Sequence, residues 1–333
     1  MSLEDVAQRA RVSPATVSRV LNNLGVVKSS TRARVLKAIE ELKYYPNVHA
    51  RALAGGASKT LGLIVSNLEN PFFLDIFRVL EQEAHANGYE VLVANTNYDL
   101  QWQNSSVRLM LGRRVAGLAL VVSEIDAAVL DELEQRKIRT VVYDVGSPRR
   151  GIMSIKSNYR KGIERVSVYL RSLGHNRISF VGHHTTLGPL SDRKSTFTQV
   201  MQRYGPQVQF TTVADSDDYA GGQRAVQQIY ASNFRPTAIL CVNDFMAAGV
   251  LRQLRDRGVD VPGQVSVTGF DNITLSEMVY PALTTLHIPR DLIGRQIFAS
   301  LTEPKPSSKV PTEIIITPEL VVRESTGRAP TES

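Results

Sequence analysis

The chain is poor in the residues that build disulfides and metal clusters. Among 333 residues there is one cysteine and one tryptophan, whereas the aromatic share of 7% is unexceptional. A single thiol can form neither an internal disulfide nor a cysteine-rich metal site, so a reducing compartment is expected. Cys241 lies in the apolar run AILCV, which is typical of a buried core position.

Long apolar runs are also missing. No stretch approaches the ~18–20 apolar residues of a membrane span, and the first residues do not form an apolar leader. We therefore expect a cytoplasmic protein with no membrane partner.

Motifs for catalysis and cofactor binding are absent as well. The sequence has no P-loop, no GxSxG motif and no metal-spaced set of histidines and cysteines. His183 and His184 form a single adjacent pair, which is more typical of a loop or a surface than of a metal site. The expectation is a binding protein rather than an enzyme, with no cofactor and no metal.

What the sequence does have is an uneven distribution of charge. Residues 1–59 contain ten Lys or Arg and four Asp or Glu, whereas residues 60–333 contain 29 basic and 28 acidic residues. Of the net charge of +7, all but one unit therefore lies in the first sixth of the chain. A basic segment of this kind favours a polyanionic partner such as DNA, with binding that weakens as salt rises.

Residues 2–22 have the pattern of two short helices joined by a tight turn. Ser2 stands three residues before Asp5, which is the spacing of a capping box, and Ser13 is placed to cap a second helix that begins at Pro14. The apolar residues of that helix, Val17, Val20 and Leu21, would face inward. The others would face outward: Ala15, Thr16, Ser18, Arg19 and Asn22. This is the geometry of a helix-turn-helix whose second helix enters a DNA major groove, although a plain amphipathic helix pair would show a similar pattern.

A third helix is expected after the turn, with Thr31 as its cap and Pro46 as its end. The next residues, 47–58, are small and basic and include Gly55 and Gly56. Such a segment forms a helix only when something supports it, so it is interpreted as a linker.

From residue 60 onward, apolar runs alternate with amphipathic stretches. The strand candidates are LGLIVS, EVLVANT, GLALVV, TVVYDV, RISFVG, VQFTTV, AILCVND and VSVTGFDN. This alternation is typical of doubly wound, parallel α/β sheets. Polar residues follow several of these strands: Asn67, Asp144, Asn243, Asp244 and Asp271. Ligands bind at that edge of open α/β sheets, so these side chains are candidates for a ligand cleft.

The ordered motifs from residue 2 to about 324 resemble those of the lactose/galactose repressor family. The matching pieces are SLEDVAQRARVSPATVSRVLN, KYYPN, ARALAGG, LGLIVSNLENPFF, VVYDV, DRKSTF, AILCVNDFMAAG, VSVTGFDN and YPALTTL. The resemblance implies an N-terminal helix-turn-helix headpiece followed by two doubly wound parallel-sheet subdomains, a core like that of periplasmic sugar-binding proteins. It implies a headpiece over 1–46, a hinge helix over 47–58 and a core over 59–325, with lobe 1 at about 60–158 plus 288–315 and lobe 2 at about 159–287 plus 316–325.

The resemblance also implies which residues contact DNA. Ser13, Thr16, Ser18 and Asn22 match phosphate contacts, Pro14 and Ala15 match variable base readers, and Arg19 matches a residue that reaches a guanine edge. Tyr44 and Asn47 match residues that anchor the hinge, and Leu53 matches a leucine wedge inserted into the minor groove. Thr31, Ala50, Arg51 and Ala54 complete the predicted DNA-binding set.

For the effector cleft, the resemblance implies seven residues. Phe72 and Phe73 resemble a wall of the cleft, Tyr219 an aromatic that stacks on the ligand, and the polar contacts are Asp144, Arg193, Asn243 and Asp271. Carboxylates, an arginine and an amide around an aromatic face suit a neutral, hydroxyl-rich molecule. A sugar or sugar derivative is the first choice and a purine-like ring the second.

The predicted function is repression by a homodimer at a pseudo-palindromic operator, under the control of a small-molecule effector. One alternative is a regulator of the same family that answers to a protein partner, and a solute-binding protein is less consistent with the basic headpiece. Whether the ligand induces or co-represses is left open. The tail RESTGRAPTES lacks leucine heptads, so a dimer formed by apolar faces of the first-lobe helices is expected.

Overall fold

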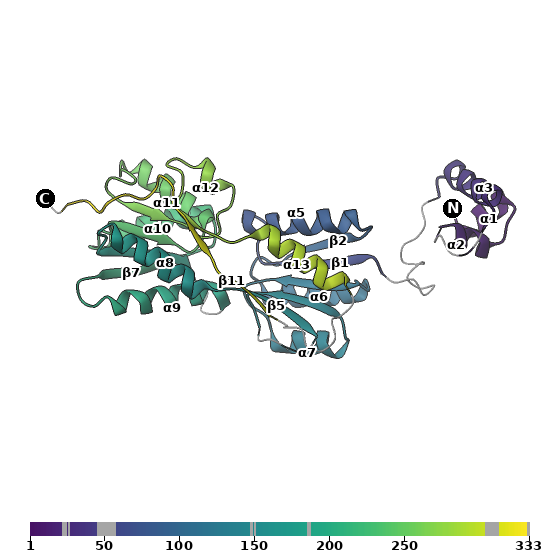
Figure 1. Ribbon diagram of the computed structural model, residues 1–333, viewed down its shortest axis with the longest axis horizontal. Helices are drawn as coiled ribbons and strands as arrows, with labels where there is room; N and C mark the ends of the chain where they lie inside the picture. Colours follow the sequence, from purple (N-terminus) through teal and green to yellow (C-terminus); the bar gives the residue numbers. More distant parts are fainter. Residues whose placement is uncertain are drawn as a thin grey trace. The chain divides into compact units, whose positions relative to one another are not determined.

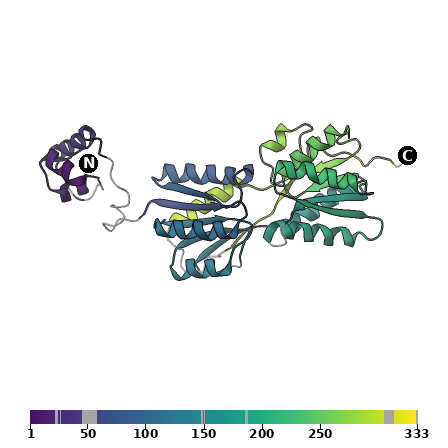
Figure 2. The ribbon, with the colours of Figure 1, turned by 180° about the vertical axis from the view of Figure 1, so that it is seen from behind.

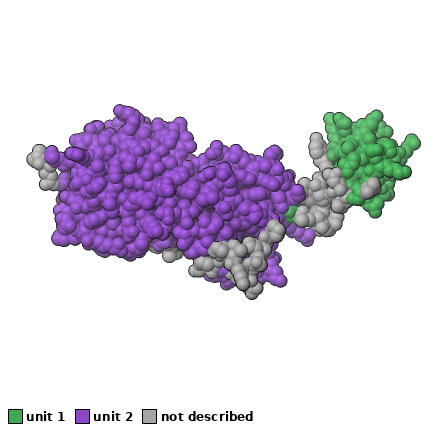
Figure 3. Space-filling model, in the orientation of Figure 1, with its two compact units in different colours: residues 1–58 green, residues 59–333 purple. Residues whose placement is uncertain are grey.

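The computed structural model describes residues 1–21, 25, 27–44, 58–146, 149, 151–184, 188–303 and 313–331. It divides into two compact units, residues 1–58 and 59–333 (Figure 3). The hydrophobic cluster of the first unit, which includes Val6, Val17 and Val35, is separate from the clusters of the second.

In its described residues the first unit consists of helices α1 (Leu3–Ala10), α2 (Pro14–Leu21) and α3 (Ser29–Glu41). The predicted capping box is confirmed, because Ser2 Oγ accepts the Asp5 N–H at 3.2 Å and Asp5 Oδ2 accepts the Ser2 N–H at 2.7 Å. Val17 and Val20 of α2 are buried, as their spacing predicted. Local side-chain bonds and one apolar stripe per helix are thus enough to form this small unit.

Helix α3 begins earlier than predicted. Its N-cap residue is Lys28, whose side chain makes no capping bond, and the Lys28 carbonyl already accepts the N–H groups of Thr31 and Arg32, each at 3.0 Å. The prediction that Thr31 caps this helix is therefore wrong, because the backbone closes one turn earlier and Thr31 lies inside the first turn. The helix ends at Glu41, and Pro46 lies outside the described residues.

The first lobe of the second unit is built on a six-stranded sheet of order β11-β5-β4-β3-β1-β2, in which every neighbouring pair is parallel. Its strands are β1 (Thr60–Val65), β2 (Glu90–Asn95), β3 (Gly117–Val121), β4 (Arg139–Tyr143), β5 (Ile152–Ser157) and β11 (Glu313–Ile316). Helices α5 (Pro71–Ala86) and α13 (Arg290–Thr302) cover one face, and α6 (Leu100–Gly112) and α7 (Ala127–Gln135) cover the other (Figures 1 and 2). Side chains alternate along β1: Leu61 and Leu63 pack with α5 and α13, whereas Ile64 packs with α6 and α7.

The second lobe is built on a four-stranded parallel sheet of order β7-β6-β8-β9. Its strands are β6 (Arg177–His183), β7 (Gln209–Asp215), β8 (Ala238–Cys241) and β9 (Ser266–Thr268), and its helices are α8 (Tyr159–Ser172), α9 (Gly188–Arg203), α10 (Tyr219–Ala231), α11 (Asp244–Asp256) and the short α12 (Leu275–Met278). Helix α8 packs on α9, and α10 packs on α11 (Figure 1). At Gly249 the two helices α10 and α11 meet so closely that a Cβ atom would lie 1.9 Å from the Tyr219 carbonyl oxygen, so only glycine fits there.

The chain crosses between the two sheets after β5, after β10 (Thr285–His287) and after β11, and β12 (Glu319–Val321) then pairs antiparallel with β10. The predicted fold class of two doubly wound parallel-sheet subdomains is confirmed. Strands β5, β10, β11 and β12 were not among the predicted strands, because they are short or, as in IMSIKS, mix apolar and polar residues without a continuous apolar run. Among the described helices, none combines the length and apolar character that a bilayer crossing requires.

Candidate functional site

The surface of α2 carries the first candidate site. Ser13 Oγ accepts the Thr16 N–H at 3.2 Å and lies 2.9 Å from Thr16 Oγ1, so the predicted cap of this helix is present. Ala15 and Arg19 are exposed on the same helix, whose opposite side packs into the headpiece core. A short helix with small residues at its start and an exposed arginine one turn later can approach the base edges of a major groove closely.

The other predicted DNA contacts lie on this unit or outside the described part. Ser18 is half-buried on α2, Thr31 is half-buried in the first turn of α3, and Tyr44 packs partly on the headpiece core. Six predicted contacts lie outside the described residues: Asn22, Asn47, Ala50, Arg51, Leu53 and Ala54.

The second candidate site is a cleft between the lobes, at the carboxyl ends of their parallel strands. The space between the side chains of this cleft amounts to about 410 Å³, part of which is open to solvent. Six of the seven predicted effector residues line it: Phe72, Phe73, Asp144, Arg193, Asn243 and Asp271. Tyr219 does not line it; this side chain stands at the start of α10 and is 36% exposed.

Asp144 follows β4 and faces the cavity from lobe 1. One carboxylate oxygen accepts the Ser157 N–H at 2.6 Å, and the other accepts the Tyr159 hydroxyl. Burial raises the pKa of Asp144 to about 6, although the Tyr159 and Ser157 hydrogen bonds and the charge of Arg193 act to lower it. The carboxyl is thus held in a fixed orientation by two hydrogen bonds.

Arg193, on α9, is the buried cation of the cleft and is 6% exposed. Its guanidinium lies 4.1 Å from the ring centroid of Tyr159 and 4.5 Å from that of Phe270, and its Nη1 donates to the Val242 carbonyl at 2.6 Å. Burial alone would lower the pKa of Arg193, but Tyr159 and the Asp271 carboxylate raise it above its usual value, so the group stays charged.

Asp271 faces the cavity from lobe 2 and is 3% exposed. Within the described residues its Oδ1 has no hydrogen-bond partner. Burial raises the pKa of Asp271 well above its usual value, against the lowering influence of Arg193. A buried oxygen without a partner is costly, so this position favours a ligand that offers a hydrogen-bond donor.

Two side chains that the sequence analysis did not select, Tyr98 and Asp217, help to close the cleft. The Tyr98 hydroxyl, in lobe 1, donates to Asp217 Oδ2 in lobe 2, and Asn67 Nδ2 donates to the Asp217 carbonyl at 3.4 Å. Asn243 Nδ2 donates to the other Asp217 oxygen, while Asn243 Oδ1 caps α11. Tyr98 and Asp217 each follow a strand, so the sheet-edge rule that selected Asn67 could have found them.

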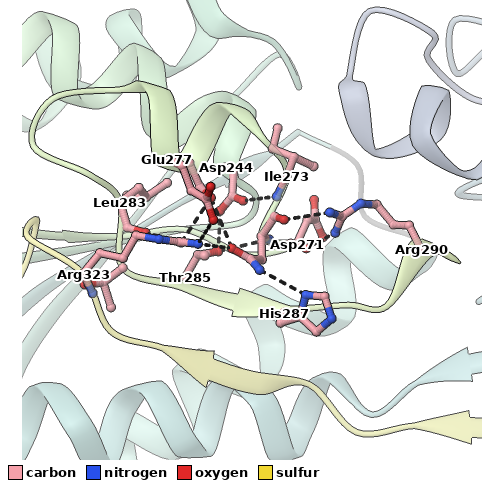
Figure 4. Close-up of polar contacts among 12 residues, drawn as sticks. Asp244, Asp271, Ile273, Glu277, Leu283, Thr285, His287, Arg290 and Arg323 are labelled. Atoms are coloured by element: carbon pink, nitrogen blue, oxygen red, sulfur yellow. Dashed lines mark hydrogen bonds and ion pairs between the residues drawn. The ribbon is translucent and has the colours of Figure 1, made fainter. Parts of the chain in front are cut away.

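A cluster of polar side chains holds the turn that contains Asp271 (Figure 4). Asp244, fully buried at the start of α11, accepts the Ile273 N–H at 2.9 Å, and burial raises its pKa to about 7. Arg290 Nη2 donates to the Asn272 carbonyl at 2.7 Å and Nη1 donates to that of Asp271. The Asp271 and Asn272 φ angles are +109° and +55°, so these bonds stabilise a left-handed turn.

A wider cavity of about 1300 Å³, including space open to solvent, adjoins the first and shares Ser123, Asp144, Tyr159 and Pro189 with it. Across the described ranges, no three His, Cys, Asp or Glu side chains are grouped as metal ligands would be. Cys241 is fully buried and burial raises the pKa of its thiol, which is typical of a core residue.

Known proteins match this arrangement along the whole chain. Residues 2–47 match the model of bacterial regulatory proteins of the lacI family, and residues 168–326 match a periplasmic binding protein-like domain. The HTH-type transcriptional repressor PurR of Photobacterium profundum is 32% identical over 327 residues, which are 97% of this chain and 98% of that protein. The chain belongs to the lacI family of bacterial regulatory proteins.

Structures of lacI-family members agree. The lac repressor dimer bound to operator and the anti-inducer ONPF has a TM-score of 0.86 at 27% identity, with 98% of this chain and 99% of that chain covered. A lacI-family regulator from Silicibacter pomeroyi has a TM-score of 0.85 at 27% identity, with 98% and 100% covered. The relatives are transcriptional repressors, so the chain is a DNA-binding repressor and not an enzyme.

Proposed function

We propose that this repressor binds a pseudo-palindromic operator as a cytoplasmic homodimer and releases or tightens its hold when a hydroxyl-rich small molecule, such as a sugar, fills the interlobe cleft. The observation that carries the effector proposal is the cavity-facing Asp271, a buried carboxyl whose Oδ1 has no partner among the described residues. A hydroxyl group is a suitable donor for it.

The headpiece supports the DNA half of this proposal. Ser13 and Thr16 present hydroxyls beside the exposed residues of α2, and Arg19 is exposed, as a fork to guanine would require. The roles of the hinge residues, including the Leu53 wedge, remain predictions. Operator binding by a dimer is supported by the lac repressor structure, which matches over nearly the whole chain.

Exposed apolar side chains on lobe 1 support the dimer. Leu74 on α5, Val93 on β2, and Leu100, Trp102 and Leu109 on α6 are all exposed by a third or more of their surface. Both α5 and α6 contact β2, and exposed apolar side chains on adjoining elements favour a protein interface. They agree with the predicted interface along the first-lobe helices.

Chemistry across the cavity favours a polyhydroxylated ligand. Asp144 and Asp217 can each accept hydrogen bonds, and Arg193 donates, so both kinds of partner are present for hydroxyl groups. The ligand would contact both lobes and thereby change their preferred separation. Its effect on operator affinity equals its differential affinity for the two lobe arrangements, typically ~1–3 kcal/mol.

A flat, purine-like ring is the second candidate, because aromatic side chains also line the cavity. The ring of Phe72 lies 5.5 Å from that of Phe73 and 5.8 Å from that of Tyr143. A planar ligand could stack among these faces.

Thermal unfolding of the full chain with a panel of monosaccharides, disaccharides and purine bases tests the proposal. A ligand present at a hundred times its dissociation constant adds about 2.7 kcal/mol to the free energy of unfolding. A sugar should raise the melting temperature of the wild type and have a smaller effect on Asp271→Asn. The same sugar should change binding to an operator duplex selected from a random pool. A response to purine bases alone would replace the sugar with the ring. If no compound acts, the protein-partner alternative replaces both.

A further inference from the structure

Arg11 occupies the turn of the helix-turn-helix in a backbone conformation that disfavours arginine. Its φ and ψ are +54° and +51°, in the left-handed region. The Arg11 N–H donates to the Gln8 carbonyl at 3.2 Å, and the Val12 N–H donates to the Ala7 carbonyl at 3.0 Å. These bonds close α1, so the turn itself requires the positive φ, which glycine adopts at less cost than any residue with a Cβ.

The side chain of Arg11 makes no contact with the described headpiece residues that would offset this strain. Arg11 is exposed, and no hydrogen bond or ion pair joins its guanidinium to another of the headpiece residues that the structure describes. Arg9 differs, because its guanidinium lies 2.5 Å from Glu41 Oε2. A strained residue at a binding surface points to a role with a partner molecule.

The position of Arg11 indicates what that partner is. Val12 packs on the headpiece core, and the residues on either side of it, Arg11 and Ser13, are both exposed. Ser13 and Thr16 are the predicted phosphate contacts at the start of α2. Arg11 therefore adds a free cation beside two hydroxyls on the DNA-facing end of this helix, where a phosphate oxygen is the matching acceptor.

We propose that Arg11 binds a DNA backbone phosphate next to the recognition helix. The inference rests on DNA binding by the headpiece and names one contact within it. A phosphate contact orients the protein on the duplex and carries no sequence information, so the effect of Arg11 is the same on every duplex.

The test measures binding of the full chain to a random-sequence DNA duplex by fluorescence anisotropy at several salt concentrations. Loss of one phosphate contact lowers the slope of log K against log salt by ~0.9 for each bound subunit. Arg11→Gln should show this decrease, and Arg11→Lys should have the slope of the wild type because it keeps a cation. Arg11→Gly should show the same decrease in slope as Arg11→Gln. Its melting temperature should nevertheless equal or exceed that of the wild type, because glycine relieves the positive φ. Arg9→Gln is the matched control, since it removes an equal charge from a paired position two residues away.

The outcomes are distinct. A slope in Arg11→Gln equal to that of the wild type, or a decrease no larger than in Arg9→Gln, would overturn the proposal. An equal decrease in Arg11→Lys, which keeps the cation, would also overturn the proposal, because a phosphate contact made by charge would survive that change. If the wild type itself shows no salt dependence, DNA binding by the headpiece fails, and the proposal fails with it.

Discussion

The headpiece and the interlobe cleft both display polar side chains to another molecule, but they hold those side chains in opposite ways. In the headpiece, Ser13 and Thr16 are bonded over three residues and stay at the surface. In the cleft, Tyr98 and Asp217 are bonded across 119 residues and lie between the lobes. A surface built locally can be changed residue by residue without loss of the fold, whereas a buried network couples ligand chemistry to the arrangement of the lobes.

The same substitution at two arginines gives the largest contrast. Arg193→Met should lower the free energy of unfolding of the core by about 3–5 kcal/mol, because it removes a buried cation that donates to the Val242 carbonyl and offsets the burial of Asp144 and Asp271. Arg19→Met should change stability by less than about 0.5 kcal/mol, since Arg19 is exposed. It should instead reduce discrimination between duplexes by about 1–3 kcal/mol. Urea unfolding followed by circular dichroism, with anisotropy titrations on the selected operator, measures both. Equal stability losses would remove the contrast between the two regions.

Burial also predicts a pH dependence for the cleft. The pKa of Asp144 is raised to about 6, so between about pH 4 and 6 the native state binds more protons than the unfolded state. Asp144 alone should therefore make the free energy of unfolding fall by about 3 kcal/mol as pH rises through this window, and Asp244, whose pKa is raised to about 7, should add a fall of the same sign that continues to higher pH. Urea midpoints measured from pH 4 to 8 should show the combined fall, and Asp144→Asn should make it smaller by about 3 kcal/mol.

Asp215 provides the control of opposite sign. Burial would raise the pKa of Asp215, but the Arg224 side chain and the Ser216 N–H lower it below its usual value. Its contribution to stability is present above its unfolded pKa and is lost as pH falls through the folded value. Asp215→Asn should therefore remove a loss of stability at acid pH. A profile in Asp144→Asn identical to that of the wild type would mean that Asp144 is not the titrating group.

The two regions also differ in how far the sequence predicts them. The spacing from Ser2 to Asp5 and the position of Ser13 just before Pro14 were sufficient to predict both caps of the headpiece, because those bonds depend on neighbours in the chain. The cap of α3 was predicted wrongly. Its N-cap residue, Lys28, accepts the first helical N–H groups with its backbone carbonyl and makes no capping bond with its side chain, so the residue type gave no indication of the helix start. Continuous apolar runs predicted the edge strands β2 and β7 as well as the central ones, but not β5, β10, β11 and β12.

In the cleft, the rule that polar residues after parallel strands meet at one edge selected Asp144, Asn243 and Asp271, which all line one cavity. It could not predict that Tyr98 bonds to Asp217, because this pair depends on how the two sheets are placed against each other. Tyr159 stacks under Arg193 for the same reason. Which side chains meet across the cleft depends on the packing of the whole core, so the spacing of residues along the chain does not predict it.

Two hydrogen bonds, one between the lobes and one at the start of α2, should differ less in their effect on stability. Tyr98→Phe removes a hydroxyl that donates to the buried Asp217 carboxylate, so it should cost about 2 kcal/mol. Ser13→Ala removes the cap of α2 and should cost about 1 kcal/mol, confined to the headpiece. Hydrogen exchange measured by mass spectrometry locates each loss. Faster exchange in the core of Ser13→Ala would contradict the independence of the two units.

The smallest expected difference in the free energy of unfolding is between two ion pairs that both join α5 to α13. Arg290 Nε lies 3.0 Å from Asp75 Oδ2, the two side chains are 13% and 21% exposed, and Arg290 also holds the Asp271 turn. Arg295 lies 3.6 Å from Glu83, and these side chains are 62% and 38% exposed. Asp75→Asn should cost about 1 kcal/mol, and Glu83→Gln less than about 0.5 kcal/mol, because water screens the exposed pair. Raising the salt concentration should reduce the cost of Glu83→Gln further but leave that of Asp75→Asn. Equal costs in urea unfolding would show that the contact with the Asp271 turn adds nothing to this pair.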